Sequence, residues 1–178
     1  MSSRFLTYVL RHHPEAIGVS LDPAGWIAID ELLDALAAHG RPLDRATLDH
    51  IVATSDKRRF EVHNGRIRAA QGHSVPVDLG LPPLVPPPVL YHGTVARFVE
   101  SIRERGLDRG RRRFVHLSPD VATARVVGAR RGQPVILRID AAGAHAAGLA
   151  FFRAANGVWL TEHVPPSMIT LLSSDPDG

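Results

Sequence analysis

The sequence has no cysteine, a single lysine, Lys57, and no apolar run approaching the roughly 20 residues that span a bilayer. The lack of cysteine excludes a disulfide framework, a thiol nucleophile and a thiolate zinc site. The N-terminus also lacks the charged-then-apolar pattern of a secretory signal, so we expect a soluble, cytoplasmic protein without membrane association. A hydrophobic content of 44% over 178 residues is normal for a globular protein and argues against general disorder.

Arginine supplies almost all of the positive charge, and its distribution along the chain is uneven. The formal net charge is +3, yet residues 1–74 hold nine basic and nine acidic residues, so the excess lies later. Six arginines fall in one short run: Arg103, Arg105, Arg109, Arg111, Arg112 and Arg113. Such a run is either a solvated surface or a contact for a polyanion such as nucleic acid or a dinucleotide. Biased genome composition explains the preference for arginine over lysine equally well.

A proline-rich stretch divides the chain into two parts. Residues 75–89, VPVDLGLPPLVPPPV, contain six prolines, which exclude a helix and favour a stiff extended connector. We therefore expect two domains, residues 1–74 and 90–178, joined by this linker. The first shows helical patterns followed by a hairpin, which suggests a winged-helix module, and the second mixes strand and helix patterns. The predicted fold class is α+β.

The first helical pattern places two basic residues at a helix end. Apolar residues at positions 5, 6, 9 and 10 share one helical face, and Pro14 ends the pattern. Arg11 and His12 therefore lie on the last turn. The dipole of a helix favours cations there, so the pair fits an ordinary charged last turn as well as a functional one.

Local signals predict the rest of the first domain. Asp30 and Asp44 are in position to cap two further helices. Asn64-Gly65, between RRFEV and RIRAA, predicts a type I′ hairpin. If Phe60 and Val62 face the core, strand alternation turns Arg59 outward, where an arginine is usually only solvated.

The second domain contains several apolar segments of strand length. Thr94 and Asp120 are in position to begin helices between them. The predicted strands are PVLYH, RFVHLS, PVILRI, LAFFRA, VWLTE and MITLL, with PVILRI and LAFFRA apolar enough to be central.

Three other groups carry polar chemistry. The QGHS run at 71–74 offers N–H groups and neutral polar side chains suited to an oxyanion or a ribose, although a run this short is often only a loop. His92 and His116 each end an apolar strand, so they are either structural or bracket one cleft. Arg130 and Arg131 precede a buried strand, where an arginine can reach a bound anion.

The spacing of these residues also argues against several classes of site. The chain has no H-x-x-x-H pair and no cluster of histidines with carboxylates, so we expect no metal. The chain lacks G-x-G-x-x-G and G-x-x-x-x-G-K-[ST], which argues against a Rossmann dinucleotide fold and against an NTPase.

Six segments in this order resemble the RNA 2′-phosphotransferase family, the NAD-dependent enzymes related to the tRNA-splicing 2′-phosphotransferase. They are FLTYVLRHHPE, LDPAGWIAIDELL, DKRRFEVHNGRIRAAQGHS, LYHGT, FVHLSPDVATARVVGARRGQPVIL and NGVWLTEHVPP, and they cover almost the whole chain. The resemblance implies an N-terminal winged-helix lobe that binds RNA and a C-terminal lobe like that of ADP-ribosyltransferases, which binds NAD.

The resemblance also implies site residues. The family's Arg-His-Arg-Arg set falls on Arg11, His12, Arg59 and Arg130, with Arg131 as second choice for the last place. Cofactor-binding positions fall on His92, Gly93, Thr94, His116, Leu117, Ser118 and Val158, a pattern of two histidines and a hydrophobic residue without a catalytic glutamate. Substrate-binding positions fall on Gln71, Gly72, His73 and Ser74, expected to face the arginines across a cleft.

The activity implied is removal of an internal RNA 2′-phosphate with NAD as co-substrate and without a metal, by a monomer. The phosphate would attack the nicotinamide ribose, and the ribose 2″-hydroxyl would then release the RNA and a cyclic phosphate. ADP-ribosyl transfer to a terminal nucleic-acid phosphate is one alternative. A winged-helix DNA-binding regulator is another, although RATLDHIVATSD has a poor charge pattern for the major groove.

Overall fold

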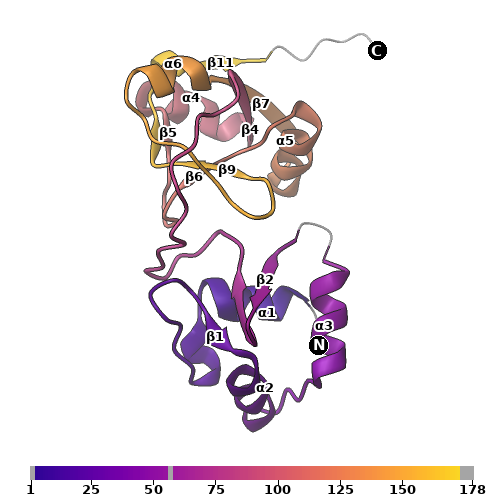
Figure 1. The fold of residues 1–178 in the computed structure, drawn as a ribbon. Helices are drawn as coiled ribbons and strands as arrows, with labels where there is room; N and C mark the ends of the chain where they lie inside the picture. The colour runs from indigo at the N-terminus through magenta and orange to yellow at the C-terminus, as the bar shows by residue number, and fades with distance from the viewer. Residues whose placement is uncertain (1–2, 56–57, 173–178) are drawn as a thin grey trace. The chain divides into compact units, whose positions relative to one another are not determined.

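The computed structural model of the chain describes residues 3–55 and 58–172. It divides into two compact units, Met1–Leu81 with Arg111–Arg113 and Pro82–Gly110 with Phe114–Gly178 (Figure 1). Each unit combines helices with small sheets, which confirms a mixed α and β fold. Within the described ranges, no helix is long and apolar enough to cross a membrane.

The first unit consists of three α-helices and a small antiparallel sheet. Its elements are α1 (Ser3–Arg11), η1 (Pro14–Ile17), β1 (Ile27–Ala28), α2 (Ile29–Ala38), α3 (Arg45–Ala53), β2 (Phe60–His63) and β3 (Arg66–Ala69). The strand order is β1-β3-β2, so β3 is central. Leu10, Leu36, Leu48 and Ile67 are fully buried in one core that joins the helices to the sheet. Each such side chain contributes about 1.5–3 kcal/mol through burial.

Local signals in the first unit predict some boundaries and miss others. Asp44 caps α3 as predicted, because its carboxylate accepts a hydrogen bond of 2.7 Å from the N–H of Thr47. The predicted cap at Asp30 is wrong, because α2 begins at Ile29 and Asp30 lies in its first turn, where a carboxylate still favours the dipole. Val62 is 41% exposed, so the prediction that it faces the core is also wrong.

The β2–β3 hairpin turns at the predicted dipeptide. Asn64 and Gly65 have φ of 47° and 70°, and both central residues of a type I′ turn require positive φ. The pairing places Phe60 opposite Ala69, at the end of the hairpin where the chain continues into residues 71–74.

Over its described residues, up to residue 172, the second unit contains three small sheets and three α-helices. Its elements are β4 (Val89–Val95), α4 (Ala96–Arg105), β5 (Leu107–Asp108), β6 (Val115–Leu117), α5 (Val121–Gly128), η2 (Ala129–Arg131), β7 (Pro134–Asp140), α6 (Ala141–Ala146), β8 (Phe152–Arg153), β9 (Trp159–Thr161), β10 (His163–Val164), η3 (Pro166–Met168) and β11 (Ile169–Leu171). The sheets have the orders β11-β7-β4, β6-β9-β8 and β10-β5. Hydrogen bonds of 2.7 and 2.9 Å between Tyr91 and Ser118 join the first two.

Two predictions for the second unit are wrong. Thr94 does not cap a helix, because β4 continues past it, pairs with β7 as far as Val95, and leaves Val95 as the cap position. LAFFRA does not form a central strand, because only Phe152 and Arg153 pair, at the edge of a sheet. Asp120 caps α5 as predicted, through a bond of 2.7 Å from the N–H of Thr123.

Candidate active site

The loop at residues 71–74 closes the C-terminal end of α1. The N–H of Ser74 donates to the carbonyl of Arg11 at 2.9 Å, which satisfies one of the acceptors that a helix end leaves open. The hydroxyl of Ser74 lies 2.8 Å from Nδ1 of His12. The structure thus brings Arg11 and His12 together with the QGHS loop, which contacts them directly within the first unit.

Gly72 lets this loop approach the guanidinium of Arg11. Its φ is +90°, a conformation that side chains rarely adopt, and a Cβ there would lie 3.3 Å from Nη1 and 3.5 Å from Cζ of Arg11. The positive φ and the short distance to the guanidinium of Arg11 together favour glycine at this position. Gly72 therefore shapes the surroundings of Arg11 through close backbone approach.

His73 is buried between this loop and the turn that holds Gly25. Its side chain is 4% exposed, and a Cβ on Gly25 would lie 3.3 Å from its Nε2. Among the described residues, the Nε2 of His73 and the Oε1 of Gln71 are buried without a hydrogen-bond partner. Burial, followed by the charges of Arg11 and Arg68 and by His12, lowers the pKa of His73 to about 4. The imidazole of His73 is therefore neutral at pH 7 and lies beneath the surface of the loop.

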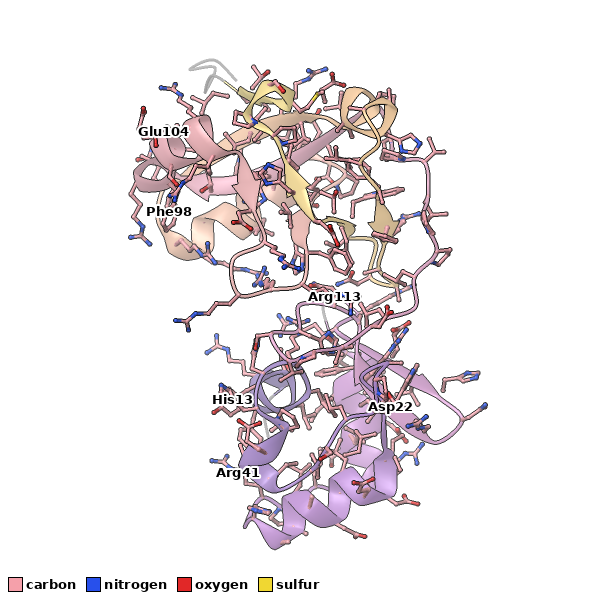
Figure 2. All side chains as sticks on the ribbon, turned by 90° about the vertical axis from the view of Figure 1, so that its left-hand side faces the viewer. His13, Asp22, Arg41, Phe98, Glu104 and Arg113 are labelled. Carbon is pink, nitrogen blue, oxygen red and sulfur yellow. The ribbon has the colours of Figure 1, made fainter. Side chains whose placement is uncertain are left out.

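His12 is also kept neutral by its surroundings. Partial burial lowers its pKa below 6.5, and Arg11, Arg112 and His13 lower it further through their positive charge. His13, labelled in Figure 2, has a different environment. Its ring stacks on Tyr8 at 4.6 Å between centroids. The RHH sequence thus contains one histidine that meets the QGHS loop and one that packs along α1.

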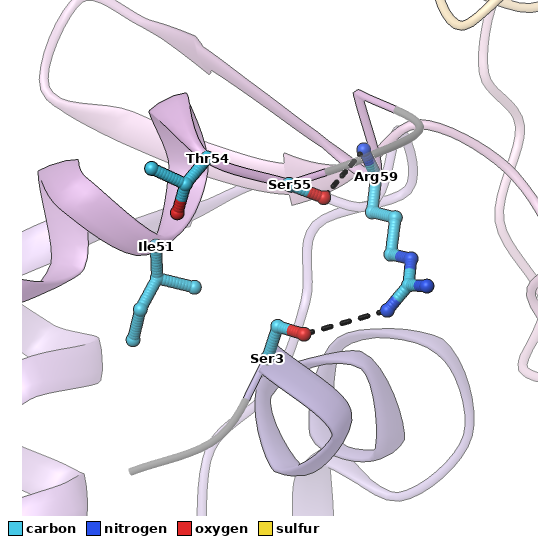
Figure 3. Close-up of a pocket in the computed structure, with 5 residues that line it drawn as sticks. All are labelled: Ser3, Ile51, Thr54, Ser55 and Arg59. Carbon is cyan, nitrogen blue, oxygen red and sulfur yellow. Dashed lines mark hydrogen bonds between the residues drawn. The ribbon is translucent and has the colours of Figure 1, made fainter.

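Arg59 lies at the opposite end of α1 from Arg11. Its Nη1 donates to Ser3 at 3.4 Å, and Ser3 is eight residues before Arg11, about 12 Å along a helix axis. Ser3 and Arg59 line a pocket of about 220 Å³ together with Ile51, Thr54 and Ser55 (Figure 3). The carbonyl of Arg59 accepts a hydrogen bond from the N–H of Ala70 at 2.9 Å, so the backbone of Arg59 adjoins the start of the QGHS loop. Its guanidinium is directed at Ser3 instead.

Arg68 is a buried residue that sequence patterns did not single out. Its Nε donates to Glu61 at 2.6 Å, and its Nη1 donates to the carbonyls of Ala24 and Leu79 at 3.1 and 3.3 Å. The guanidinium also lies 4.5 Å from the ring centroid of Trp26. These contacts tie the hairpin, the Gly25 turn and the chain after the QGHS loop together. A hint was available in the sequence, since Glu61 and Arg68 are cross-strand neighbours on the same face of the hairpin.

In the second unit, His92 and His116 are neighbours. The prediction that each ends its strand is wrong, because β4 continues to Val95 and β6 to Leu117. The Nδ1 of His92 donates to the carbonyl of His116 at 2.9 Å, which leaves its Nε2 as the other ring nitrogen. Leu117 pairs with Trp159, so Val158 lies beside the end of β6 where Ser118 follows. His92, His116, Ser118 and Val158 therefore gather where β4, β6 and β9 meet.

Gly93 is a packing position as well as a site candidate. A Cβ on it would lie 1.8 Å from the carbonyl oxygen of Ala124 and 2.8 Å from the nitrogen of Gly128, so α5 rests directly on the backbone of β4. Thr94 and Leu117 are 5% and 1% exposed. These two candidates can offer a ligand little more than backbone atoms.

The remaining arginines fall into different surroundings. Arg130 and Arg131 lie in η2, directly after α5, and both are exposed, so neither is favoured over the other. Arg45, the early basic residue of α3, pairs with Asp49 at 3.0 Å, which weakens a DNA-reading role for that helix. Arg113 donates to the carbonyl of Val77, so the arginine run is partly tied to the first unit (Figure 2). No group of metal-ligating side chains occurs in the part of the chain that the structure describes.

Comparison with known proteins identifies relatives over nearly the full length. The model of the family described as "RNA 2'-phosphotransferase, Tpt1 / KptA family" matches residues 1–163. A "Probable RNA 2'-phosphotransferase" of Streptomyces coelicolor is 60% identical over 163 residues, 92% of this chain and 90% of the relative. Proteins with the same name from Streptomyces griseus and Pseudomonas aeruginosa are 54% and 56% identical, over 95% and 94% of this chain and 94% of each relative. The chain therefore belongs to the RNA 2′-phosphotransferase family.

Proposed function

We propose that this protein is an RNA 2′-phosphotransferase that removes an internal RNA 2′-phosphate with NAD as co-substrate. The observation that carries the proposal is the cluster of Arg11, His12 and the QGHS loop, since it joins a guanidinium, a neutral imidazole and a glycine-shaped backbone in one place. The names of the close relatives support the RNA substrate. NAD as co-substrate is supported by the family resemblance.

The first step needs positioning more than base catalysis. A 2′-phosphate carries about −1.5 to −2 charges at neutral pH, so it is already a nucleophile. Its oxygen would attack C1″ of the nicotinamide ribose, and nicotinamide would leave with the electron pair of the broken C–N bond. The guanidinium of Arg11 offers a planar fork that would hold phosphate oxygens in line, and neutral His12 adds an N–H donor. Arg59 would join them only after its side chain turns away from Ser3.

The second unit offers the groups that would bind NAD. His92 and His116 are adjacent, and His92 has its orientation fixed by its bond of 2.9 Å to the His116 carbonyl. A ring nitrogen of such a histidine suits a ribose hydroxyl or a pyrophosphate oxygen. Gly93 follows His92 within β4, and Ser118, whose backbone is bonded to Tyr91, follows Leu117 of β6. A catalytic glutamate is not needed, because the acceptor is already an anion.

The second step releases the dephosphorylated RNA. The ribose 2″-hydroxyl would attack phosphorus, the bond between phosphorus and the RNA 2′-oxygen would break, and ADP-ribose 1″,2″-cyclic phosphate would leave. The proton of the 2″-hydroxyl ends on the RNA 2′-oxygen, so charge is balanced. Arg11, Arg59 and Arg130 would stabilise the negative charge that spreads over the phosphoryl oxygens.

The test is to mix the protein with NAD and an oligonucleotide that carries one internal 2′-phosphate, in the presence of a chelator. Nicotinamide, the cyclic phosphate and the dephosphorylated oligonucleotide should appear together in equal amounts. An oligonucleotide with only a 5′-phosphate should give none of them, and an ADP-ribosylated 5′ end would instead favour terminal transfer.

A matched pair of variants on α1 tests the site. Arg11→Ala should abolish turnover, whereas Arg4→Ala, which changes an exposed arginine of the same helix, should not. Equal activity of the two variants, or no product with the wild-type protein, would refute the proposal.

A further inference from the structure

Ser74 makes two contacts with the end of α1 that serve different purposes. Its backbone N–H binds the carbonyl of Arg11 at 2.9 Å and fixes where the loop lies. Its hydroxyl lies 2.8 Å from Nδ1 of His12 and fixes how the ring is turned. Because Nδ1 is engaged, Nε2 is the ring nitrogen that remains for a substrate. The side chain that was expected to bind substrate is thus directed at His12.

The Ser74 hydroxyl can act as donor or as acceptor toward His12, whereas an ionised carboxylate can only accept. It can donate to Nδ1, which leaves the proton on Nε2, or accept from Nδ1–H, which leaves a lone pair on Nε2. Rotation of one O–H bond therefore exchanges the two tautomers while the ring keeps its place. A carboxylate would hold the Nδ1–H form and favour the imidazolium ion.

The charges around His12 agree with a ring that stays neutral until an anion binds. The groups that face it are Arg11 on α1, His13 after it, His73 beneath it and Arg112, and none of them is a carboxylate. All of them disfavour the imidazolium ion when they are charged. Ser74 is the neutral partner in this set.

We infer that Ser74 is a positioning residue of the proposed reaction, holding His12 so that Nε2 first donates to the 2′-phosphate and then accepts the proton of the ribose 2″-hydroxyl. This inference rests on the proposed function. In the second step the bond from the 2″-oxygen to phosphorus forms and the bond from phosphorus to the RNA 2′-oxygen breaks. The proton passes from the 2″-hydroxyl to Nε2 and from Nε2 to the RNA 2′-oxygen, so His12 returns to its neutral form.

The first measurement uses the free protein and no substrate. Nitrogen-15 shifts of the His12 ring, assigned with His12→Gln, report its tautomer and its pKa. The wild-type protein and Ser74→Thr should show both tautomers in exchange. Ser74→Asp should shift His12 to the Nδ1–H form and raise its pKa. Ser20→Ala, which changes an exposed serine of the same unit, should leave the His12 signals unchanged.

The second measurement is turnover as a function of pH. Ser74→Ala should lower kcat by about tenfold to a hundredfold, the range found when the group that orients a functional histidine is removed. The KM for NAD should stay within about twofold, Ser74→Thr should restore kcat, and Ser74→Asp should move the acidic limb of the profile to higher pH.

The two measurements separate two kinds of failure. If Ser74→Ala leaves kcat and the nitrogen-15 shifts like those of Ser20→Ala, the inference is overturned. If the His12 signals respond to Ser74 but the wild-type protein turns over no RNA, the contact stands and the proposed function is overturned.

Discussion

Acidification should destabilise the first unit, and His73 should account for a defined part of the loss. Its imidazole is 4% exposed, and its pKa falls from 6.5 to about 4 because of burial and the charges of Arg11 and Arg68. The unfolded chain therefore takes up this proton first as the pH falls. Stability that depends on the neutral imidazole is fully present above pH 6.5 and is lost between pH 6.5 and about 4.

The size of this loss follows from the two pKa values. At about 1.4 kcal/mol for each pH unit between them, the full loss is about 3 kcal/mol. About 2 kcal/mol of it should be reached at about pH 4.5. The carboxylates with lowered pKa, Glu15, Asp22 and Asp44, lose their contributions at lower pH, because their usual pKa values of 4.5 and 3.8 are themselves depressed. The window between pH 6.5 and 4.5 therefore reports mainly on histidine.

The assay is hydrogen exchange of the α1 amides at about pH 7 and about pH 4.5, corrected for the intrinsic exchange rate at each pH. His73→Phe keeps a ring but does not titrate, so its opening free energy should fall by about 2 kcal/mol less than that of the wild-type protein. His73→Gln provides a smaller side chain that also does not titrate. His63→Phe changes an exposed histidine of β2 and should behave like the wild-type protein.

Equal losses in the wild-type protein and in both His73 variants would refute the reasoning. The same would follow from a His73 pKa near 6.5 in a nitrogen-15 titration. A smaller loss in His63→Phe, with both His73 variants behaving like the wild-type protein, would show that a surface histidine, and not the buried one, controls the acid response.

Four further changes test other contacts. Gly93→Ala should cost about 1–3 kcal/mol in urea unfolding, because its Cβ would lie 1.8 Å from a helix carbonyl, and unchanged stability would show that α5 moves freely. Gly72→Ala should lower kcat/KM by at least about tenfold through displacement of Arg11, with a melting temperature that falls only slightly. Arg68→Met should cost about 3 kcal/mol, because it leaves a half-buried carboxylate without its partner. Arg59→Ala should abolish turnover and change stability by less than about 0.5 kcal/mol, and an unfolded variant would instead indicate a structural role.

Signals within a few residues predicted parts of the fold well. The spacing of apolar residues over 5–10 placed Arg11 on the last turn of α1, and Asp44 and Asp120 cap the helices that follow them. Asn64-Gly65 adopts the positive φ values that its hairpin requires. These features depend on local backbone sterics and on hydrogen bonds to nearby N–H groups, which sequence displays directly.

The same signals failed where contacts distant in sequence competed with them. Thr94 is a good cap by residue type, but pairing of β4 with β7 carries the strand through Val95 opposite Pro134. Val62 alternates correctly with Phe60, yet β2 is the edge strand of its sheet, and Val62 stays 41% exposed although Ile67 opposite it is fully buried. Strand pairing decided the outcome at Thr94, and the extent of the core decided it at Val62. Both depend on residues distant in sequence, which the local pattern does not show.

The composition of the candidate site was predicted from sequence, but its geometry was not. The residue types of the QGHS loop suggested polar chemistry, whereas its contact with α1 joins residues 62 positions apart. The guanidinium of Arg59 was expected with Arg11 and instead binds Ser3. Arg68 was absent from the expectation, because its importance comes from burial beneath three segments of chain.

The neutral state of His12 and His73 determines how the site responds to a bound anion. Burial and arginine charges lower the pKa values of His12 and His73, so the free protein holds fixed positive charge here without additional imidazolium ions. A bound phosphate dianion reverses the electrostatic balance at His12, because an opposite charge nearby favours the protonated ring. Binding of phosphate and uptake of a proton are then coupled, and by reciprocity a proton on His12 strengthens binding of phosphate. A histidine held by Ser74 would therefore be neutral in the free protein, and any proton that it takes up with the anion must leave before Nε2 can accept the proton of the 2″-hydroxyl.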